Sequence, residues 1–300
     1  MDKQKRKKRG PFTILLIVLL LGVMAFSGYK IIDQLLIYKK GQNAYEDLRS
    51  QVLQTGEAPS TLATKPWNVP VAEPSGEKAA PVSREESVTA ADDERGDITY
   101  DPLETLSGEM QIIPWWNVDF EMLRTINPDV KAWLYGMDGM VNYPVVQGKD
   151  NEYYDHRLLD GTEQFCGTLF ADCRNDFLKD DITYIYGHKM KDGSMFGHFG
   201  KYDTYAYYAT HPTFRLFTPS EVYELQVIAC VYTTKWEPLH FTFENEEAFN
   251  EIMEDYQRRS QFRTAVDIEY GDQFVCLWTC AYYREDGRMF ILCKAVRTVE

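Results

Sequence analysis

Short runs of residues with high β-propensity fill the C-terminal two thirds of the chain and constrain its fold more than any other feature. Turn residues separate the runs, as in Thr218-Pro-Ser-Glu221. Short strands at such spacing are typical of an antiparallel barrel or sandwich. The expected strands are 132–135, 143–147, 167–171, 183–186, 213–217, 223–232, 273–279 and 289–296. The sequence therefore predicts a mostly β domain.

Two helices are expected within this domain. Asn117 or Asp119 caps a short helix that ends before Pro128. A longer helix over residues 246–262 has Asn245 as its cap and places its apolar residues on one face. Acidic residues in its first turn and arginines near its end complement the helix dipole. Both helices are therefore additions to a domain built of strands.

The N-terminus has a different composition. Residues 1–10 are rich in Lys and Arg, and Phe12 to Tyr29 is almost continuously apolar, about the length that spans a hydrocarbon core. The positive-inside rule then places residues 1–10 in the cytoplasm, residues 11–29 in the membrane and the rest of the chain outside the cell. A cleaved signal peptide is the alternative, because Ala25-Phe-Ser27 is a passable cleavage site.

Residues 30–111 are expected to connect the membrane anchor to the domain outside the cell. The first part, from Gln34 to Gln54, reads as a helix. Prolines, small residues and acids dominate from Glu57 to Pro102, and such a segment buries too little apolar surface to offset chain entropy. We therefore predict a disordered spacer, followed by one folded domain over residues 112–300.

Composition excludes one class of partner. The formal net charge is −14 even though the first ten residues are strongly basic. Binding to nucleic acid requires clustered cations on the folded domain, and the sequence contains no such cluster there. We expect no nucleic-acid partner and no cofactor.

Six cysteines in an exported chain raise the question of disulfides. Most read as small apolar residues in strands, and Cys166 with Cys173 is the pair that stays open. Cys276 and Cys280 share one face of an expected strand about 13 Å apart, which is too far for a disulfide. A zinc site is the other possibility for these two thiols, but it needs two more ligands, and we expect no metal.

Three reactive side chains stand at the ends of expected strands. Cys280 closes the run Phe274-Val-Cys-Leu-Trp-Thr-Cys280, His188 ends the run Tyr184-Ile-Tyr-Gly-His188, and Arg288 follows the polar loop after Cys280. A thiol, an imidazole and a guanidinium are the groups that acyl transfer through a thioester needs. Cys280, His188 and Arg288 are therefore the candidate catalytic residues.

Each of these residues also has an ordinary structural explanation, as a packed thiol, a histidine at a turn or a solvated arginine. His198 is the second choice for the histidine. A two-residue turn at Asp286-Gly287 would pair Glu285 with Arg288 and carry the guanidinium far from the thiol. The catalytic interpretation requires a wider loop that places Arg288 opposite Cys280.

Residues 118–297 resemble class B sortases of Gram-positive bacteria. The most specific matches are Ile126-Asn-Pro-Asp-Val130, Asn142-Tyr-Pro-Val-Val-Gln-Gly-Lys-Asp-Asn151 and Tyr186-Gly-His-Lys-Met-Lys-Asp-Gly-Ser-Met-Phe-Gly197. The resemblance implies the eight-stranded sortase β-barrel, in which residues 246–262 correspond to a helix between the sixth and seventh strands. It also implies a membrane-anchored cysteine transpeptidase.

The resemblance gives each candidate a role. Cys280 is implied as nucleophile, His188 as general acid and base, and Arg288 as electrostatic stabiliser. The implied reaction cleaves the C-terminal sorting signal of an exported protein after Thr and passes the acyl group through a thioester to an amine of a cell-wall precursor or a pilin. By the same resemblance, the residues expected along the peptide groove are Asn142, Val146, Trp278 and Thr279.

One departure from the family pattern bears on specificity. The family usually has Thr-Leu-Ser-Thr-Cys, whereas this chain has Cys276-Leu-Trp-Thr-Cys280. Trp278 lies two residues before the nucleophile, so we expect its side chain on the same strand face, where it reshapes the groove.

Two other functions stay open. One is a cysteine peptidase that releases the acyl group to water, and the other is a non-enzymatic surface module.

Overall fold

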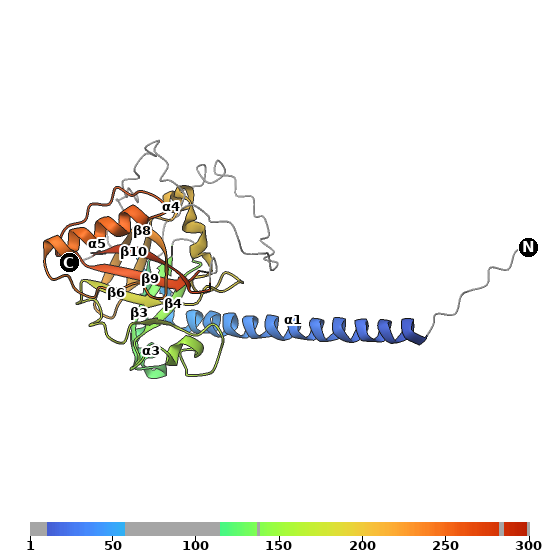
Figure 1. The fold of residues 1–300 in the computed structure, drawn as a ribbon. Coiled ribbons are helices and arrows are strands. Elements are labelled where there is room, and N and C mark those ends of the chain that lie inside the picture. Colours follow the sequence, from blue (N-terminus) through green and yellow to red (C-terminus); the bar gives the residue numbers. More distant parts are fainter. Residues whose placement is uncertain (1–10, 58–114, 137–138, 282–284, 299–300) are drawn as a thin grey trace, which may run out of the picture.

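A computed structural model of the protein describes residues 11–57, 115–136, 139–281 and 285–298 (Figure 1). The predicted basic tail at residues 1–10 and the predicted spacer from residue 58 onward lie outside the described residues.

Eight strands close into a barrel in the order β10-β8-β7-β3-β4-β5-β6-β9. The strands are β3 (Val130–Gly136), β4 (Asn142–Val146), β5 (Leu169–Ala171), β6 (Ile182–Tyr186), β7 (Thr213–Phe217), β8 (Val222–Thr234), β9 (Phe274–Cys280) and β10 (Gly287–Arg297). Each expected strand is present within a few residues, which confirms the mostly β fold and the eight-stranded barrel. Two neighbouring pairs, β4 with β5 and β6 with β9, are parallel, so the barrel is not wholly antiparallel.

The strands that carry the candidate residues are buried on both faces. In β9, Val275 and Leu277 belong to the cluster that fills the barrel, whereas Phe274, Cys276 and Trp278 belong to a second cluster outside it. This alternation follows from the two-residue period of a strand. Cys280 continues the series of residues that point outward.

Helix α5 (Glu246–Arg259) covers this second cluster. It lies between β8 and β9, the sixth and seventh strands of the barrel, as the resemblance implied. The Asn245 side chain accepts a hydrogen bond from the amide of Ala248 at 2.9 Å, as expected for an N-cap. Phe249, Met253 and Tyr256 form its buried face, and the helix ends at Arg259, three residues before the predicted end.

One helix joins the apolar N-terminal segment to the barrel. Helix α1 (Pro11–Val52) extends away from the barrel in Figure 1, and within the described residues it is the one helix long and apolar enough to cross a membrane. Its last turns are different, because Tyr45, Leu48 and Val52 are buried against the barrel. Strand β1 (Leu53–Thr55) then pairs with β2 (Trp116–Val118). The packed unit therefore includes residues upstream of the expected boundary at residue 112.

Short helices occupy the connections. They are α3 (Phe120–Ile126), the 3-10 helices η1 (Tyr153–His156) and η2 (Gly197–Asp203), and α4 (Tyr205–Thr210). The Asp119 carboxylate accepts a hydrogen bond from the amide of Met122 at 2.8 Å, so Asp119 is the cap of α3. Helix η1 follows β4 and reaches the same end of the barrel as the candidate residues, as its contacts below show.

Candidate active site

Strand register places Arg288 directly opposite Cys280. Strands β9 and β10 are antiparallel, and the Cα partner of Cys280 is Arg288. The amide of Ala281 donates to the carbonyl oxygen of Gly287 at 3.0 Å, which closes a wide loop beyond the pair. Directly opposed residues of an antiparallel pair project to the same face, about 5 Å apart. The two-residue turn is therefore excluded, and the side chains of Cys280 and Arg288 start from opposed positions on one face of the sheet.

His188 reaches the same place from the other side of β9. Strands β6 and β9 are parallel, with Tyr186 beside Trp278. Beyond that pair, the amide of Gly187 donates to Trp278 O at 3.1 Å, and Thr279 Oγ1 donates to Gly187 O at 2.7 Å. These two bonds continue the register, which sets His188 beside Cys280. A Cβ atom at position 187 would lie 2.4 Å from Leu169 Cδ2, so a larger residue at this junction would displace the packed side chains around it.

Cys280, His188 and Arg288 line one pocket of about 380 Å³ on the outer face of the barrel. Trp278 and Thr279 of β9 also line it. Four charged side chains that no sequence motif marks also line the pocket: Asp155, Arg174, Lys235 and Glu237. The pocket therefore combines a thiol and an imidazole with charged groups of both signs.

The pocket does not include Asn142 or Val146. Val146 has no exposed surface and packs in the barrel core, and its place along the peptide groove stays a prediction. Asn142 Oδ1 accepts a hydrogen bond from Trp133 Nε1 at 2.6 Å, and its backbone oxygen accepts one from Arg49 Nη1 at 3.3 Å. Asn142 thus links β4 to β3 and to helix α1. The sequence placed both residues on a strand, and the structure places them at the two ends of β4.

Trp278 forms a fixed wall of the pocket. Its ring stacks on Phe290 with centroids 5.2 Å apart and planes 17° apart, and it meets the edges of Tyr184 and Tyr186. Only 7% of the residue is exposed. These three aromatic contacts hold the ring against the barrel, so Trp278 shapes the pocket beside Cys280 as a rigid surface.

Cys280 differs from most of the other thiols in its exposure. All six cysteines are unbridged, and only Cys173 and Cys280 are half-buried. Burial raises the pKa of the four other thiols, which belong to Cys166, Cys230, Cys276 and Cys293. A buried thiol with a raised pKa supplies little thiolate, so these four are poor nucleophiles. Cys280 is thus the accessible thiol that lies beside an imidazole.

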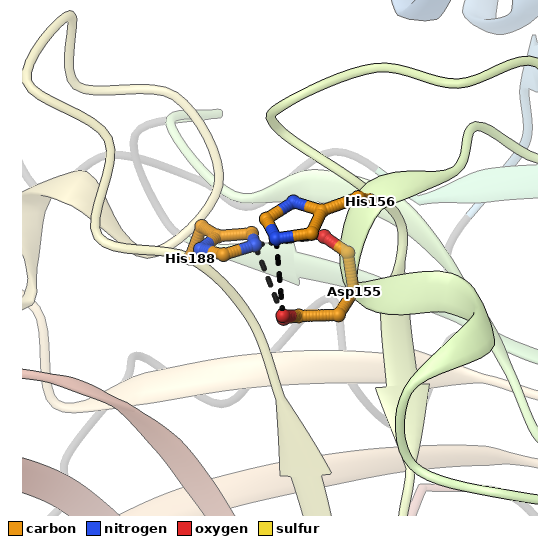
Figure 2. Close-up of side chains that lie close together, drawn as sticks. All are labelled: Asp155, His156 and His188. Carbon is orange, nitrogen blue, oxygen red and sulfur yellow. Dashed lines mark hydrogen bonds and ion pairs between the residues drawn. The ribbon is translucent and has the colours of Figure 1, made fainter.

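The partner of His188 is Asp155, at the end of helix η1. His188 Nε2 lies 2.7 Å from the backbone oxygen of Asp155 and 3.1 Å from its Oδ1 (Figure 2). Burial by itself lowers the pKa of His188, but the hydrogen bonds and the charge of Asp155 outweigh it, and the net effect is a raised pKa. The hydrogen bond from His188 lowers the pKa of the Asp155 carboxyl, and the charges of His156 and Arg288 act in the same direction.

Asp155, His156 and His188 bring one ligand atom each within 4.8 Å of one another, so they are a candidate metal cluster. The rings of His156 and His188 are nearly parallel, however, with centroids 5.1 Å apart and planes 19° apart. The Nε2 atoms of both rings face the carboxylate of Asp155, at 3.1 Å for His188 and 3.5 Å for His156. The three residues are arranged as a hydrogen-bonded group around one carboxylate.

No family model matches the chain. Curated proteins and solved structures do match it. Sortase B of Listeria monocytogenes is 35% identical over 180 residues, which cover 58% of this chain and 72% of that protein. Sortase B of Staphylococcus aureus is 29% identical over 182 residues, with 59% of this chain and 75% of that protein covered.

Solved structures agree with the curated relatives. A Staphylococcus aureus sortase B–substrate complex has a TM-score of 0.57 and 28% identity, covering 60% of this chain and 85% of that one. A Bacillus anthracis protein described as similar to sortase B has a TM-score of 0.57 and 31% identity, covering 64% of this chain and 87% of that one. This chain therefore belongs to the sortase B family and is a sortase-type cysteine transpeptidase.

Proposed function

We propose that this protein cleaves the C-terminal sorting signal of exported proteins after threonine and transfers the new acyl end to an amine of a cell-wall precursor or a pilin. The observation that carries the proposal is the convergence of Cys280, His188 and Arg288 in one pocket, set by the registers of β6, β9 and β10. Family membership supports the reaction class, and the three positions match the family's motifs.

In the first half of the proposed reaction, the Cys280 thiolate attacks the carbonyl carbon of the threonine residue. A sulfur–carbon bond forms, and the carbon–nitrogen bond to the next residue breaks. The imidazolium of His188 gives its proton to the departing nitrogen, which leaves as an amine. The products of this half are a thioester on Cys280 and a neutral His188.

In the second half, the acceptor amine attacks the thioester carbonyl. The new carbon–nitrogen bond forms, the amine passes a proton to His188, and the sulfur leaves as a thiolate. The protein returns to its starting charges, with His188 protonated and Cys280 ionised. No other reactant is needed, because a peptide bond is exchanged for another amide bond.

Arg288 is suited to the negative charge that develops on the carbonyl oxygen in both halves. Its Nη1 donates to the backbone oxygen of Gly287 at 2.9 Å, which orients the guanidinium beside the strand. A planar guanidinium has five N–H donors, so most of them stay available for a substrate oxygen. Donors that are already in place when the oxyanion forms are worth several kcal/mol, roughly 10²- to 10³-fold in rate for one donor.

The proposal includes anchoring in the membrane. Residues 1–10 would lie in the cytoplasm, residues 11–29 would span the bilayer, and residues 112–300 would form the catalytic domain outside the cell. The apolar start of α1 and the basic residues before it support this topology. Residues 30–44 of α1 would then hold the barrel roughly 20 Å above the membrane, at 1.5 Å per residue.

The experiment that tests the function is turnover of the full chain in detergent against a panel of Pro-x-Thr pentapeptides, with and without a short peptide that offers a free amino group. We expect cleavage after threonine and a ligated product whose share rises with the concentration of the amine. Release of the free acid alone at every amine concentration would instead identify a peptidase. Lack of cleavage of any threonine peptide would contradict the proposed substrate class.

A further inference from the structure

Asp155 offers two acceptors to a single nitrogen of the His188 ring. Its backbone oxygen lies 2.7 Å and its carboxylate Oδ1 3.1 Å from Nε2. A nitrogen that faces two acceptors carries the hydrogen, so the neutral ring is the tautomer protonated at Nε2. Nδ1 makes no hydrogen bond with any residue that the structure describes. Nδ1 is therefore the atom that accepts a proton in the neutral ring and donates one in the imidazolium.

The backbone at Asp155 is held firmly. Asp150 Oδ1 accepts hydrogen bonds from the amides of Glu152 at 2.9 Å and Tyr153 at 2.8 Å, which starts helix η1. Gly167 packs directly on the Asp155 carbonyl: its φ is +58°, and a Cβ atom there would lie 2.2 Å from Asp155 O. The carbonyl that receives His188 thus belongs to a packed segment, so it can fix the position of the ring.

Stacking restricts the ring further. The centroids of the His156 and His188 rings are 5.1 Å apart, and their planes differ by 19°. The centroid of the Phe165 ring is 5.6 Å from that of His188, and the two planes differ by 21°. His156 Nε2 is 3.5 Å from Asp155 Oδ2, and a dashed line in Figure 2 marks this ion pair. The carboxylate is therefore shared between two stacked histidines, and the closer contact is to His188.

Asp155 also offsets positive charge near His188. Arg288 is a permanent cation in the same pocket, and a nearby cation disfavours protonation of a histidine. Asp155 is close enough to Arg288 for the two charges to interact. The titratable and charged groups that face His188 are Asp155 and His156 of η1, Cys280 of β9 and Arg288 of β10, with Tyr186, Arg174, Lys235 and Glu237 around the rim. Asp155 is the carboxylate among them that contacts the ring.

We infer that Asp155 is a positioning residue of the reaction: it fixes the His188 ring through Nε2, directs Nδ1 toward the scissile bond and balances the charge of the imidazolium. The inference rests on the proposed function for its catalytic meaning. Its structural content, the control of the protonation of His188, is independent of turnover.

The test replaces Asp155 with asparagine, which keeps an acceptor oxygen but removes the charge. His188 is titrated by NMR in the full chain in detergent micelles, labelled at histidine Cε1, in a Cys280→Ala background so that no thiol titration is coupled to the ring. His188→Gln identifies the signal. We expect Asp155→Asn to lower the pKa of His188, so that the imidazolium is lost at a lower pH. Asp155→Glu should restore part of the effect.

In protein that keeps Cys280, Asp155→Asn should lower kcat/KM by roughly 10- to 100-fold, mostly through kcat, because a misplaced catalytic group can cost about 10²-fold. In the pH profile of kcat/KM, the high-pH limb, where the imidazolium of His188 is lost, should move to lower pH. The matched control is Glu163→Gln, which removes one negative charge from the same segment, where Glu163 pairs with Arg157 at 3.3 Å. It should leave the titration and the turnover unchanged.

A titration of His188 that is the same in Asp155→Asn, Asp155→Glu and Glu163→Gln would overturn the inference. Because the titration uses protein without the Cys280 thiol, its outcome does not depend on transpeptidation. If the proposed function failed, either the unaltered protein would cleave no threonine peptide or Cys280→Ala would retain turnover, while the NMR result could stand. If the inference failed, Cys280→Ala would still be inactive.

Discussion

Replacement of Cys280 by alanine is expected to abolish turnover and leave the barrel folded. In the proposed reaction, the sulfur of Cys280 forms the bond to the acyl group, and alanine has no sulfur. Position 280 is the last residue of β9 and is half-buried, and its pairing with Arg288 depends on backbone atoms. The change therefore removes one sulfur and no strand bond. Peptide cleavage and thermal unfolding, measured on the same preparation, check both halves of the expectation.

The control for this variant is Cys173→Ala. Cys173 is the other half-buried thiol, and it lies in the loop after β5, where its amide donates to Asn151 Oδ1 at 2.7 Å. This contact uses the backbone, so alanine preserves it and turnover should stay near that of the unaltered protein. Turnover that persists in Cys280→Ala would reject Cys280 as the nucleophile.

The second large effect is expected at Arg288. Arg288→Lys should lower kcat by about 10²- to 10³-fold with a small change in KM, the range seen when an oxyanion donor is lost. Lysine keeps the charge, but its single ammonium cannot hold the Gly287 carbonyl and a substrate oxygen in the fixed geometry of a guanidinium. Steady-state kinetics with a threonine peptide measure both parameters.

A matched substitution on the same strand separates this effect from a general effect of losing an arginine. Arg297 lies at the far end of β10, where it pairs with Glu221 at 3.0 Å and is largely exposed. An exposed ion pair contributes about 0–1 kcal/mol to stability, so Arg297→Lys should leave kcat unchanged. Equal losses in the two variants, or full activity in Arg288→Lys, would contradict the assigned role.

The strands were predictable because their composition and spacing are local properties of the sequence. All eight expected runs are strands, and the cap residues Asp119 and Asn245 begin helices as predicted. The pairing of the strands was less accessible. The parallel neighbours β4–β5 and β6–β9 depend on how distant segments meet, and no local pattern specifies that.

The candidate site was predictable in part. The sequence indicated Cys280, His188 and Arg288, but two loop closures were compatible with it, and the closure between Ala281 and Gly287 decides between them. Trp278 lines the pocket. Its stacking on Phe290 could not be predicted, because Phe290 lies on β10 and reaches Trp278 only when β9 and β10 pair.

Asp155 was missed for a physical reason. It lies 33 residues before His188 in a 3-10 helix, and its contact with Nε2 depends on the packing of Gly167 against its carbonyl. Neither strand periodicity nor a catalytic motif marks such a residue. The dipeptide Asp155-His156 is visible in the sequence, but only the fold shows that it lies beside the imidazole of His188.

In the proposed reaction, the sulfur of Cys280 carries the acyl group between donor and acceptor. The direct measurement is mass spectrometry of the full chain after acid quenching of a reaction with a cleavable threonine peptide and no amine, followed by mapping of the adduct. We expect a single acyl adduct, on Cys280, that disappears when the amine is added and is absent in Cys280→Ala. An adduct on another residue, or turnover without any adduct in protein trapped at short times, would contradict it.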